Sequence, residues 1–126
     1  MKKIVYSPKA PEPIGPYSQG VAFGNLLFLS GQIAIRQETG DLIMSSIADE
    51  TRQVMENIKF LLEAAGSDFS KIVKTSIFLS SMSHFQEVNQ VYASYFEGDY
   101  PARETVAVNG LPKGVNVEIS VIVALN

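Results

Sequence analysis

The amino-acid sequence predicts an α+β fold in which two helices pack on one face of a six-stranded β-sheet. Two segments repeat apolar residues every three or four positions, as amphipathic helices do. Six other segments are rich in β-branched, aromatic and other apolar residues and are bounded by turn-forming residues. The segments follow the order β-β-β-α-β-α-β-β without repeats or low-complexity linkers, so one domain over residues 1–126 is expected.

The first part of the chain is expected to supply three strands and an ordered loop. Residues 3–6 form a short strand candidate, and four prolines within residues 8–16 then force an extended segment with few hydrogen bonds. Residues 21–23 and 26–35 are the next two strands. Gly24-Asn25 between these two strands indicates a hairpin.

A long amphipathic helix is predicted to follow from Ile47. Its apolar positions step by three or four residues as far as Ala65. Ser46 and Asp49 have the spacing of a capping box at the helix start, and Gly66 suits a stop just past its end.

The rest of the chain is expected to supply a second helix and three more strands. Strands are predicted at residues 72–80, 103–108 and 115–125. In the helix after the first of these, Ser83 and Gln86 have capping-box spacing, and Gly98 ends the helix. This helix is expected to bury Phe85, Val88, Tyr92, Tyr95 and Phe96.

One face of the predicted sheet has no cover within the chain. Two helices cover only one face, yet strands 26–35 and 115–125 carry apolar residues on both of their sides. Subunit association is the simplest way to cover the second face, and symmetric homo-oligomers are the commonest assemblies. The sequence therefore predicts a homo-oligomer.

The composition argues against several classes of function. Ten Lys and Arg against thirteen Asp and Glu give a net charge of −3, the wrong sign for a general nucleic-acid binder. There is no Cys and only one His, so a metal site would have to depend on carboxylates, and none is expected. The apolar runs are far shorter than the about 20 residues of a membrane helix, and prolines stand where a signal peptide would be apolar. A soluble cytoplasmic protein is expected.

Two charged residues are the main candidates for chemistry. Glu118 interrupts an apolar strand, and burial would raise its pKa toward the range useful for proton transfer; an exposed position at the sheet rim is the alternative. Arg103 begins a strand, where its planar guanidinium can bind a small carboxylate through two parallel hydrogen bonds. The alternative for Arg103 is a surface ion pair with Glu104 or Asp99.

Four other residues are weaker candidates. Ser30 and Gly31 break an apolar strand, which indicates a bulge or the close approach of a ligand. Tyr17 in the Pro-rich loop either contacts a ligand or plugs a hydrophobic gap, and Asn89 either supports a site or lies on a solvated helix flank. His84 has no partner at a recognisable spacing and is given no role.

Ordered motifs along essentially the whole chain resemble the RidA/YjgF family of reactive intermediate deaminases. The motifs are Ala10-Pro11, Ile14-Gly15-Pro16-Tyr17-Ser18-Gln19, Asn25-Leu26-Leu27-Phe28-Leu29-Ser30-Gly31-Gln32, Gly40-Asp41-Leu42, Glu56-Asn57-Ile58, Leu62-Glu63-Ala64-Ala65-Gly66, Val88-Asn89-Gln90-Val91-Tyr92, Pro101-Ala102-Arg103, Leu111-Pro112-Lys113 and Val117-Glu118-Ile119. Pro101-Ala102-Arg103 alone would carry no weight, but so many motifs in one order make the resemblance specific.

The resemblance implies a chorismate-mutase-like fold with a mixed sheet, and a homotrimer with three sites in clefts between subunits. It also implies hydrolysis of 2-imino acids such as 2-iminobutanoate and 2-iminopropanoate to 2-keto acids and ammonia, without a cofactor. Two alternatives stay open. One is a non-catalytic trimer that binds small carboxylates and regulates a partner enzyme. The other is an endoribonuclease or translation inhibitor, against which the acidic charge balance argues.

The resemblance further implies roles for individual residues. Arg103 would hold the substrate carboxylate, and Glu118 would activate a water molecule and later return its proton. The residues that would contact substrate are Arg103, Tyr17, Ser30, Gly31, Asn89 and Thr105. Thr105 replaces a Cys that is frequent in the family, and Glu104 replaces a small residue, so side-chain preference is left open.

The relative direction of Arg103 and Glu118 is a geometric question that the sequence raises. If the last two strands paired symmetrically about Pro112, the two side chains would point to opposite faces of the sheet. A register offset, a bulge or a contact across a subunit interface would bring them together.

Overall fold

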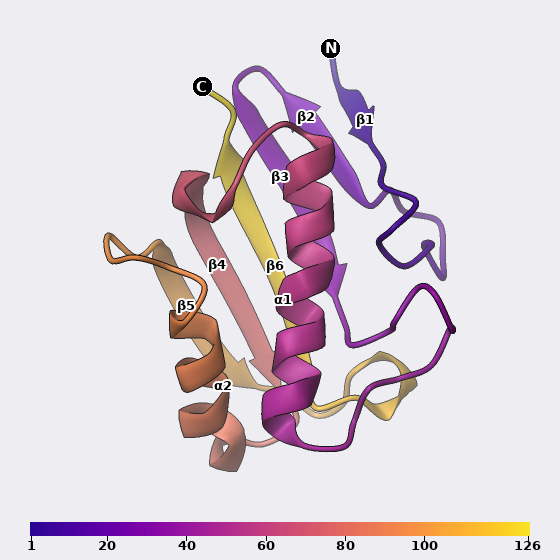
Figure 1. Ribbon diagram of the computed structural model, residues 1–126, viewed down its shortest axis with the longest axis vertical. Helices are drawn as coiled ribbons and strands as arrows, with labels where there is room; N and C mark the ends of the chain where they lie inside the picture. The colour runs from indigo at the N-terminus through magenta and orange to yellow at the C-terminus, as the bar shows by residue number, and fades with distance from the viewer.

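The computed structural model describes residues 1–126, and its elements follow the predicted order (Figure 1). The strands are β1 (Lys3–Val5), β2 (Gly20–Phe23), β3 (Leu26–Gln32), β4 (Ile72–Leu79), β5 (Ala102–Ala107) and β6 (Val117–Ala124). The helices are α1 (Ile47–Ala64) and α2 (Phe85–Ala93), and three single turns of 3₁₀ helix span Phe69–Lys71, Met82–His84 and Pro112–Gly114. The α+β class and the order of elements are confirmed.

The six strands form one mixed sheet in the order β1-β2-β3-β6-β4-β5. β4 and β5 are parallel because α2 connects them as a crossover, and every other neighbouring pair is antiparallel. β4 therefore lies between β5 and β6. The pairing of the last two strands about Pro112, on which the predicted opposition of Arg103 and Glu118 depended, is wrong.

Both helices lie on the same face of the sheet, and the core fills the space between the two layers (Figure 1). β6 runs through the middle and alternates strictly, because its buried residues are Val117, Ile119, Val121 and Val123. From α1, fully buried side chains such as Ile58 and Leu61 pack against this face. Burying apolar surface from two layers is the main favourable term in the stability of such a fold.

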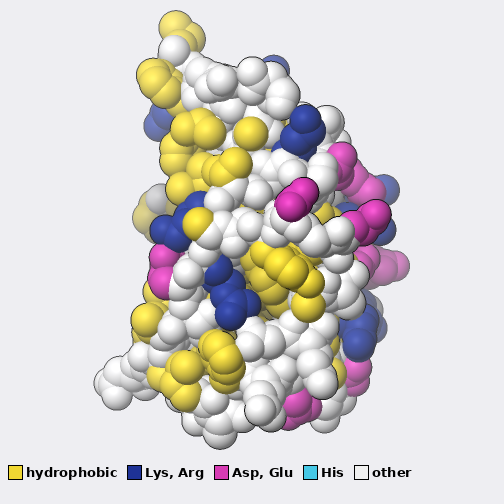
Figure 2. Space-filling view, turned by 90° about the vertical axis from the view of Figure 1, so that its left-hand side faces the viewer, with side chains coloured by type: hydrophobic (Ala, Val, Ile, Leu, Met, Phe, Trp, Pro, Cys, Tyr) yellow, Lys and Arg dark blue, Asp and Glu magenta, His cyan; other side chains and the backbone are white.

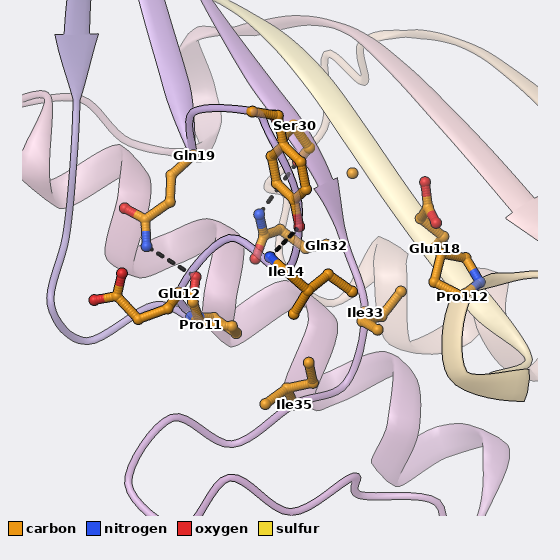
Figure 3. Close-up of a pocket in the computed structure, with 12 residues that line it drawn as sticks. Pro11, Glu12, Ile14, Gln19, Ser30, Gln32, Ile33, Ile35, Pro112 and Glu118 are labelled. Carbon is orange, nitrogen blue, oxygen red and sulfur yellow. Dashed lines mark hydrogen bonds between the residues drawn. The ribbon is translucent and has the colours of Figure 1, made fainter.

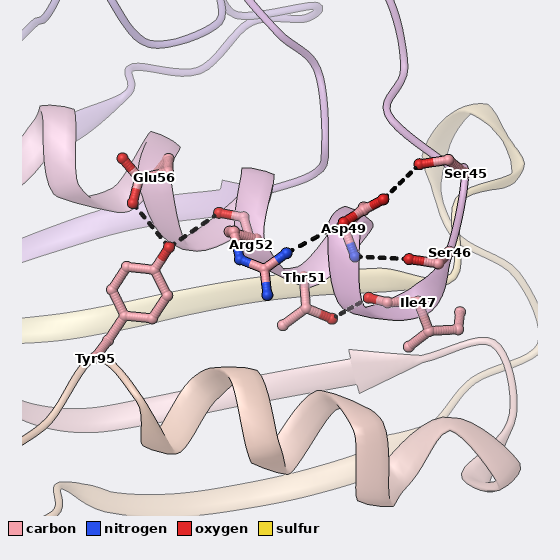
Figure 4. A network of polar contacts seen from close by, with 8 residues as sticks. All are labelled: Ser45, Ser46, Ile47, Asp49, Thr51, Arg52, Glu56 and Tyr95. Atoms are coloured by element: carbon pink, nitrogen blue, oxygen red, sulfur yellow. Dashed lines mark hydrogen bonds and ion pairs between the residues drawn. The ribbon is translucent and has the colours of Figure 1, made fainter.

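The predicted ends of α1 are confirmed. The Ser46 hydroxyl accepts a hydrogen bond of 3.0 Å from the Asp49 backbone N–H, whereas the Asp49 carboxylate binds other side chains, so the capping box is half formed (Figure 4). Gly66 has a φ of +70°, and the N–H of Ser67 donates to the Leu62 carbonyl at 2.8 Å. This left-handed stop is the glycine-based C-cap that the sequence indicates.

The predicted ends of α2 are wrong. The hydroxyl of Ser81, not Ser83, acts as the cap, and it caps the 3₁₀ turn that precedes the helix. The helix begins at Phe85 and ends at Ala93, well before Gly98. A tight 3₁₀ turn uses the same serine-rich sequence that a capping box would use, so the spacing could not distinguish them.

The second face of the sheet is apolar and open. Its exposed large side chains include Ile4, Phe23, Leu26, Phe28 and Val106. Figure 2 views the molecule from the side and shows apolar side chains along the left-hand edge, where this face lies in profile. The expectation that the chain leaves one face uncovered is confirmed. Neither helix combines the length and the hydropathy that a membrane span requires.

Candidate functional site

A pocket of about 310 Å³ lies between the Pro-rich loop, β3 and the start of β6 (Figure 3). It is lined by Pro11, Glu12, Ile14, Tyr17, Gln19, Ser30, Gly31, Gln32, Ile33, Ile35, Pro112 and Glu118. In Figure 3, Glu118 and Pro112 lie on one side and Pro11 and Glu12 on the other. The pocket, called the Glu118 pocket below, thus brings together four predicted site residues, which are Tyr17, Ser30, Gly31 and Glu118.

A β-bulge shapes the floor of the Glu118 pocket. Between the pairs Leu29–Val121 and Gln32–Ile119, the two residues Ser30 and Gly31 face the single residue Ser120. Pairing with β6 resumes beyond the bulge only at Gln32, where β3 ends, so the prediction of a strand to residue 35 is wrong. A Cβ on Gly31 would lie 2.3 Å from Oε2 of Glu118, so only glycine allows the carboxylate to pack against this backbone.

Glu118 is the half-buried carboxylate of the pocket. It lies on the face of the sheet opposite the helices, and it makes no hydrogen bond or ion pair within the chain. Burial raises its pKa above the ordinary value for glutamate. Glu118 is half-buried on β6, which lies between β3 and β4, so it does not occupy an exposed position at the sheet rim. An unpartnered carboxylate with a raised pKa in a pocket can take and return a proton.

The buried side chain of Gln19 holds the Pro-rich loop beside Glu118. Its carbonyl accepts from the Ser7 backbone N–H at 2.7 Å. Its amide nitrogen lies 3.1 Å from the carbonyl oxygen of Ser7, 3.3 Å from that of Ala10 and 2.9 Å from that of Pro11. Since prolines cannot donate hydrogen bonds, one side-chain amide replaces the backbone pairing that this loop lacks.

The hydroxyl groups of the pocket also bind the loop. Ser30 Oγ donates to the Ser18 carbonyl at 2.6 Å, and the Ser30 N–H donates to the Gln19 carbonyl at 2.9 Å. The Tyr17 hydroxyl accepts from the Ile14 N–H at 3.2 Å, while the residue as a whole is 45% exposed. Tyr17 therefore lines the pocket and does not fill a hydrophobic gap within the chain.

Sequence reasoning missed the other eight lining residues as site candidates. The missed residues are Pro11, Glu12, Ile14, Gln19, Gln32, Ile33, Ile35 and Pro112. They lie in the loop, after the bulge and in the 3₁₀ turn before β6, where no periodicity marks them. The available signal was a family motif, since Pro11, Ile14, Gln19, Gln32 and Pro112 all belong to the quoted motifs.

Arg103 lies on the opposite face of the sheet from Glu118. It pairs in register with Thr75, which is buried beneath the helices, whereas Glu118 pairs with Phe78 on the open face. The Cζ atom of Arg103 is 5.2 Å from the centre of the Tyr92 ring. The structure therefore does not bring Arg103 and Glu118 together within one chain.

No acidic residue pairs with Arg103. Glu104 accepts a hydrogen bond from Ser76 and pairs with Lys74 at 2.9 Å on the open face, and these contacts lower the pKa of Glu104. The predicted alternative of an ion pair with Glu104 or Asp99 is therefore wrong. Because Glu104 points away from Arg103, its departure from the family pattern does not change the surroundings of the guanidinium.

Thr105 and Asn89 lie near Arg103, and these three residues are called the Arg103 cluster. Thr105 follows Arg103 on the same face of β5, and its hydroxyl is buried without a hydrogen-bond partner. Asn89 lies on α2 one turn from Phe85 and from Tyr92, whose rings flank the guanidinium. The predicted site residues thus form two separate groups, one on each face of the sheet.

The structure contains no group of three or more His, Asp or Glu side chains that could hold a metal ion. His84 occupies the N-cap position of α2 without making a side-chain cap hydrogen bond.

Known proteins share the sequence and the fold of this chain. A 2-iminobutanoate/2-iminopropanoate deaminase from Dermatophagoides farinae is 43% identical over 124 residues, covering 98% of this chain and 97% of the relative. The Rid family protein YyfA from Yersinia pestis superposes with a TM-score of 0.95 at 47% identity, covering 98% of this chain and 99% of that structure. Escherichia coli TdcF with bound serine gives 0.92 at 38% identity, covering 97% and 98%.

The family model described as "Endoribonuclease L-PSP" matches residues 7–125, nearly the whole chain. Its match agrees with the mixed sheet, the two helices on one face and the motifs along the chain. The chain therefore belongs to the endoribonuclease L-PSP family, which is the RidA/YjgF family that its motifs resemble.

Proposed function

We propose that this protein hydrolyses reactive 2-imino acids, such as 2-iminobutanoate and 2-iminopropanoate, to 2-keto acids and ammonia. The observation that carries the proposal is Glu118, a half-buried carboxylate with a raised pKa and no partner within the chain, at the edge of a pocket. The name of the mite deaminase and the serine bound by the Escherichia coli relative support a small substrate of this chemical class.

Glu118 acts as general base and then as general acid in the proposed reaction. It takes a proton from water as the water oxygen bonds to the carbon of the protonated imine, C=NH₂⁺, and the π electrons of that bond move to nitrogen. The resulting carbinolamine has the carbon bonded to OH and to NH₂. Glu118 then returns its proton to the nitrogen, and the C–N bond breaks with its electron pair leaving on ammonia. The hydroxyl oxygen forms the C=O bond of the keto acid, and its proton passes to the departing ammonia, which leaves as ammonium.

The other pocket residues position the reacting atoms in this proposal. The Ser30–Gly31 bulge lets the backbone approach the Glu118 carboxylate, and the wall formed by Tyr17 limits access of bulk water. A pKa that burial raises keeps the proton on Glu118 long enough to be returned, since the protonated form is less unfavourable than in water.

We also infer that a second copy of the chain completes the site. The substrate carboxylate needs a cation, and Arg103 has no carboxylate partner, but it lies on the other face of the sheet from Glu118. The apolar open face supports association of copies, since an exposed patch of this kind marks an interface. A homotrimer with Arg103, Asn89 and Thr105 of one copy beside the Glu118 pocket of the next is the proposed assembly.

The assembly is expected to be a stable trimer in solution. Sedimentation equilibrium at micromolar concentration should give about three times the 13.8 kDa of one chain, because a monomer would leave one sheet face in water. A monomer at this concentration would contradict the proposed assembly and the shared site.

The hydrolysis is expected to appear in a coupled assay. A threonine or serine dehydratase would generate the imino acid in situ, with semicarbazide present to trap the fraction that has not been hydrolysed. The protein should speed the appearance of the 2-keto acid and reduce semicarbazone formation in proportion to its concentration. Unchanged rates with both dehydratases would contradict the proposal, and tight binding of 2-oxobutanoate without acceleration would instead favour a regulatory carboxylate-binding protein.

A further inference from the structure

The guanidinium of Arg103 has an unusual environment for a charged group at a partly buried position. Within the chain it has no ion pair and no side-chain hydrogen bond. Its contacts are instead aromatic, because its Cζ lies 5.2 Å from the ring centre of Tyr92 and 5.8 Å from that of Phe85. Both distances fall within the range of about 6 Å over which a ring face attracts a cation.

The two rings are fixed on one side of α2. Phe85 and Tyr92 are seven residues apart, which is about two helical turns, so they face the same side. Tyr92 is only 4% exposed, and its hydroxyl donates to Thr75 Oγ1 at 2.9 Å. Burial raises the pKa of Tyr92, so its hydroxyl keeps the proton that it donates.

We propose that Phe85 and Tyr92 are positioning residues that clamp the guanidinium of Arg103 and leave its N–H edge free to bind the carboxylate of the substrate. The inference rests on the proposed function, in which Arg103 binds that carboxylate. A ring face attracts a guanidinium through its plane, whereas a carboxylate uses the N–H donors at its edge. An acidic partner within the chain would occupy those N–H donors, whereas the two rings leave them free.

The clamp has a consequence for binding. A free arginine side chain loses rotamer freedom when it binds a ligand, and this loss lowers affinity. An arginine that two rings already hold loses less, so the clamp is expected to improve affinity rather than the rate of the chemical step. This places its effect on the dissociation constant for a stable carboxylate and on KM, with little effect on kcat.

The test substitutes Phe85, which is only partly buried, and compares the variants with a matched substitution of Phe60 on α1. Phe85→Leu keeps apolar volume and removes the ring, Phe85→Tyr keeps the ring, and Phe60→Leu makes the same change on α1 at a similar burial. For the full-length assembly, calorimetry would measure the dissociation constant for 2-oxobutanoate, and ¹H–¹⁵N spectra would follow the Nε–H of Arg103.

Phe85→Leu is expected to raise the dissociation constant for 2-oxobutanoate about fivefold to tenfold, with kcat within about twofold. The Arg103 Nε–H resonance should lose part of its ring-current shift. Phe85→Tyr and Phe60→Leu should behave like the wild type. Tyr92→Phe, which keeps the ring and loses the bond to Thr75, should raise the dissociation constant by no more than about threefold.

Two results would overturn the clamp. One is an unchanged dissociation constant in Phe85→Leu, whether or not the Arg103 resonance moves, and the other is a wild-type protein that does not bind 2-oxobutanoate. Failure of the proposed hydrolysis is a separate result, because it would appear as absent turnover while binding and its dependence on Phe85 persist.

Discussion

Glu118→Gln is expected to lower kcat for imine hydrolysis by about 10²- to 10⁴-fold. Glutamine keeps the shape of the side chain but cannot take a proton from water, so the chemical step loses its base. Binding of 2-oxobutanoate should stay within about threefold of the wild-type value, because the carboxylate of this ligand is expected to contact Arg103. Stopped-flow single-turnover kinetics would measure the chemical step, and calorimetry would measure binding.

The pH dependence gives an independent check on the same residue. The base form of Glu118 must be ionised, and burial raises its pKa, so wild-type activity should fall on acidification at a higher pH than an exposed glutamate would cause. The Glu118→Gln variant should lack this acidic limb in its residual activity.

Stability should move in the opposite direction from activity. A carboxyl group whose pKa is higher in the folded state favours folding when it is protonated, below its unfolded pKa. That contribution is lost as the pH rises through the folded pKa of Glu118. Glu118→Gln should therefore melt at or above the wild-type temperature at pH 7. Glu56→Gln makes the same exchange at a carboxylate on α1 that accepts a hydrogen bond from the Tyr95 hydroxyl, and it is the control that should leave turnover unchanged. A Glu118→Gln variant with full turnover per folded chain would mean that Glu118 is not the base.

Local patterns predicted the elements because the relevant forces act over a few residues. The alternation from Val117 to Val123 identifies a strand with a buried side, and Gly66 identifies the end of α1 because only a few residue types accept a positive φ. At α2 the same reasoning failed. The serines before Phe85 form hydrogen bonds within a 3₁₀ turn. A capping box and a 3₁₀ turn use the same residue types at similar spacing, so the sequence does not distinguish them.

Long-range pairing could not be derived from the sequence alone. The crossover through α2 places β5 parallel to β4, so β4 lies between β5 and β6. A symmetric hairpin about Pro112 would instead have paired β5 directly with β6. Nevertheless, Arg103 and Glu118 do point to opposite faces, because β4 pairs Arg103 with Thr75 and Glu118 with Phe78. The expected opposition is thus correct, although the pairing from which it was argued is wrong.

The candidate site was predictable where polar or small residues interrupt an apolar pattern. Ser30, Gly31 and Glu118 break two core strands, and all three meet at the bulge. Gln19 shows what escaped prediction. Its side-chain amide donates to several backbone carbonyls of a loop that has no periodic pattern. A hydropathy pattern does not reveal such hydrogen bonds, so the role of Gln19 could not be predicted from it.

Arg103→Lys is expected to lower kcat/KM for imine hydrolysis about 10- to 100-fold although the charge is kept. Lysine lacks the planar pair of N–H donors that binds a carboxylate in parallel, and it packs less well against the two rings that flank Arg103. Most of the loss should appear in KM and in the dissociation constant for 2-oxobutanoate. Steady-state kinetics in the coupled assay and calorimetry would measure both.

The matched control is Arg52→Lys, which makes the same exchange at an exposed pair with Asp49 on α1 and should leave both constants unchanged. Raising the salt concentration separates the two possible roles of Arg103. If Arg103 acts only through its charge, the lysine variant should have near-normal kinetics at low salt. The kcat/KM of the wild type and of the variant should then fall together as salt screens the attraction. A bidentate role predicts a deficit that is already present at low salt and persists at high salt. Near-normal activity of Arg103→Lys would therefore remove the proposed bidentate contact while leaving the assignment of Glu118 intact.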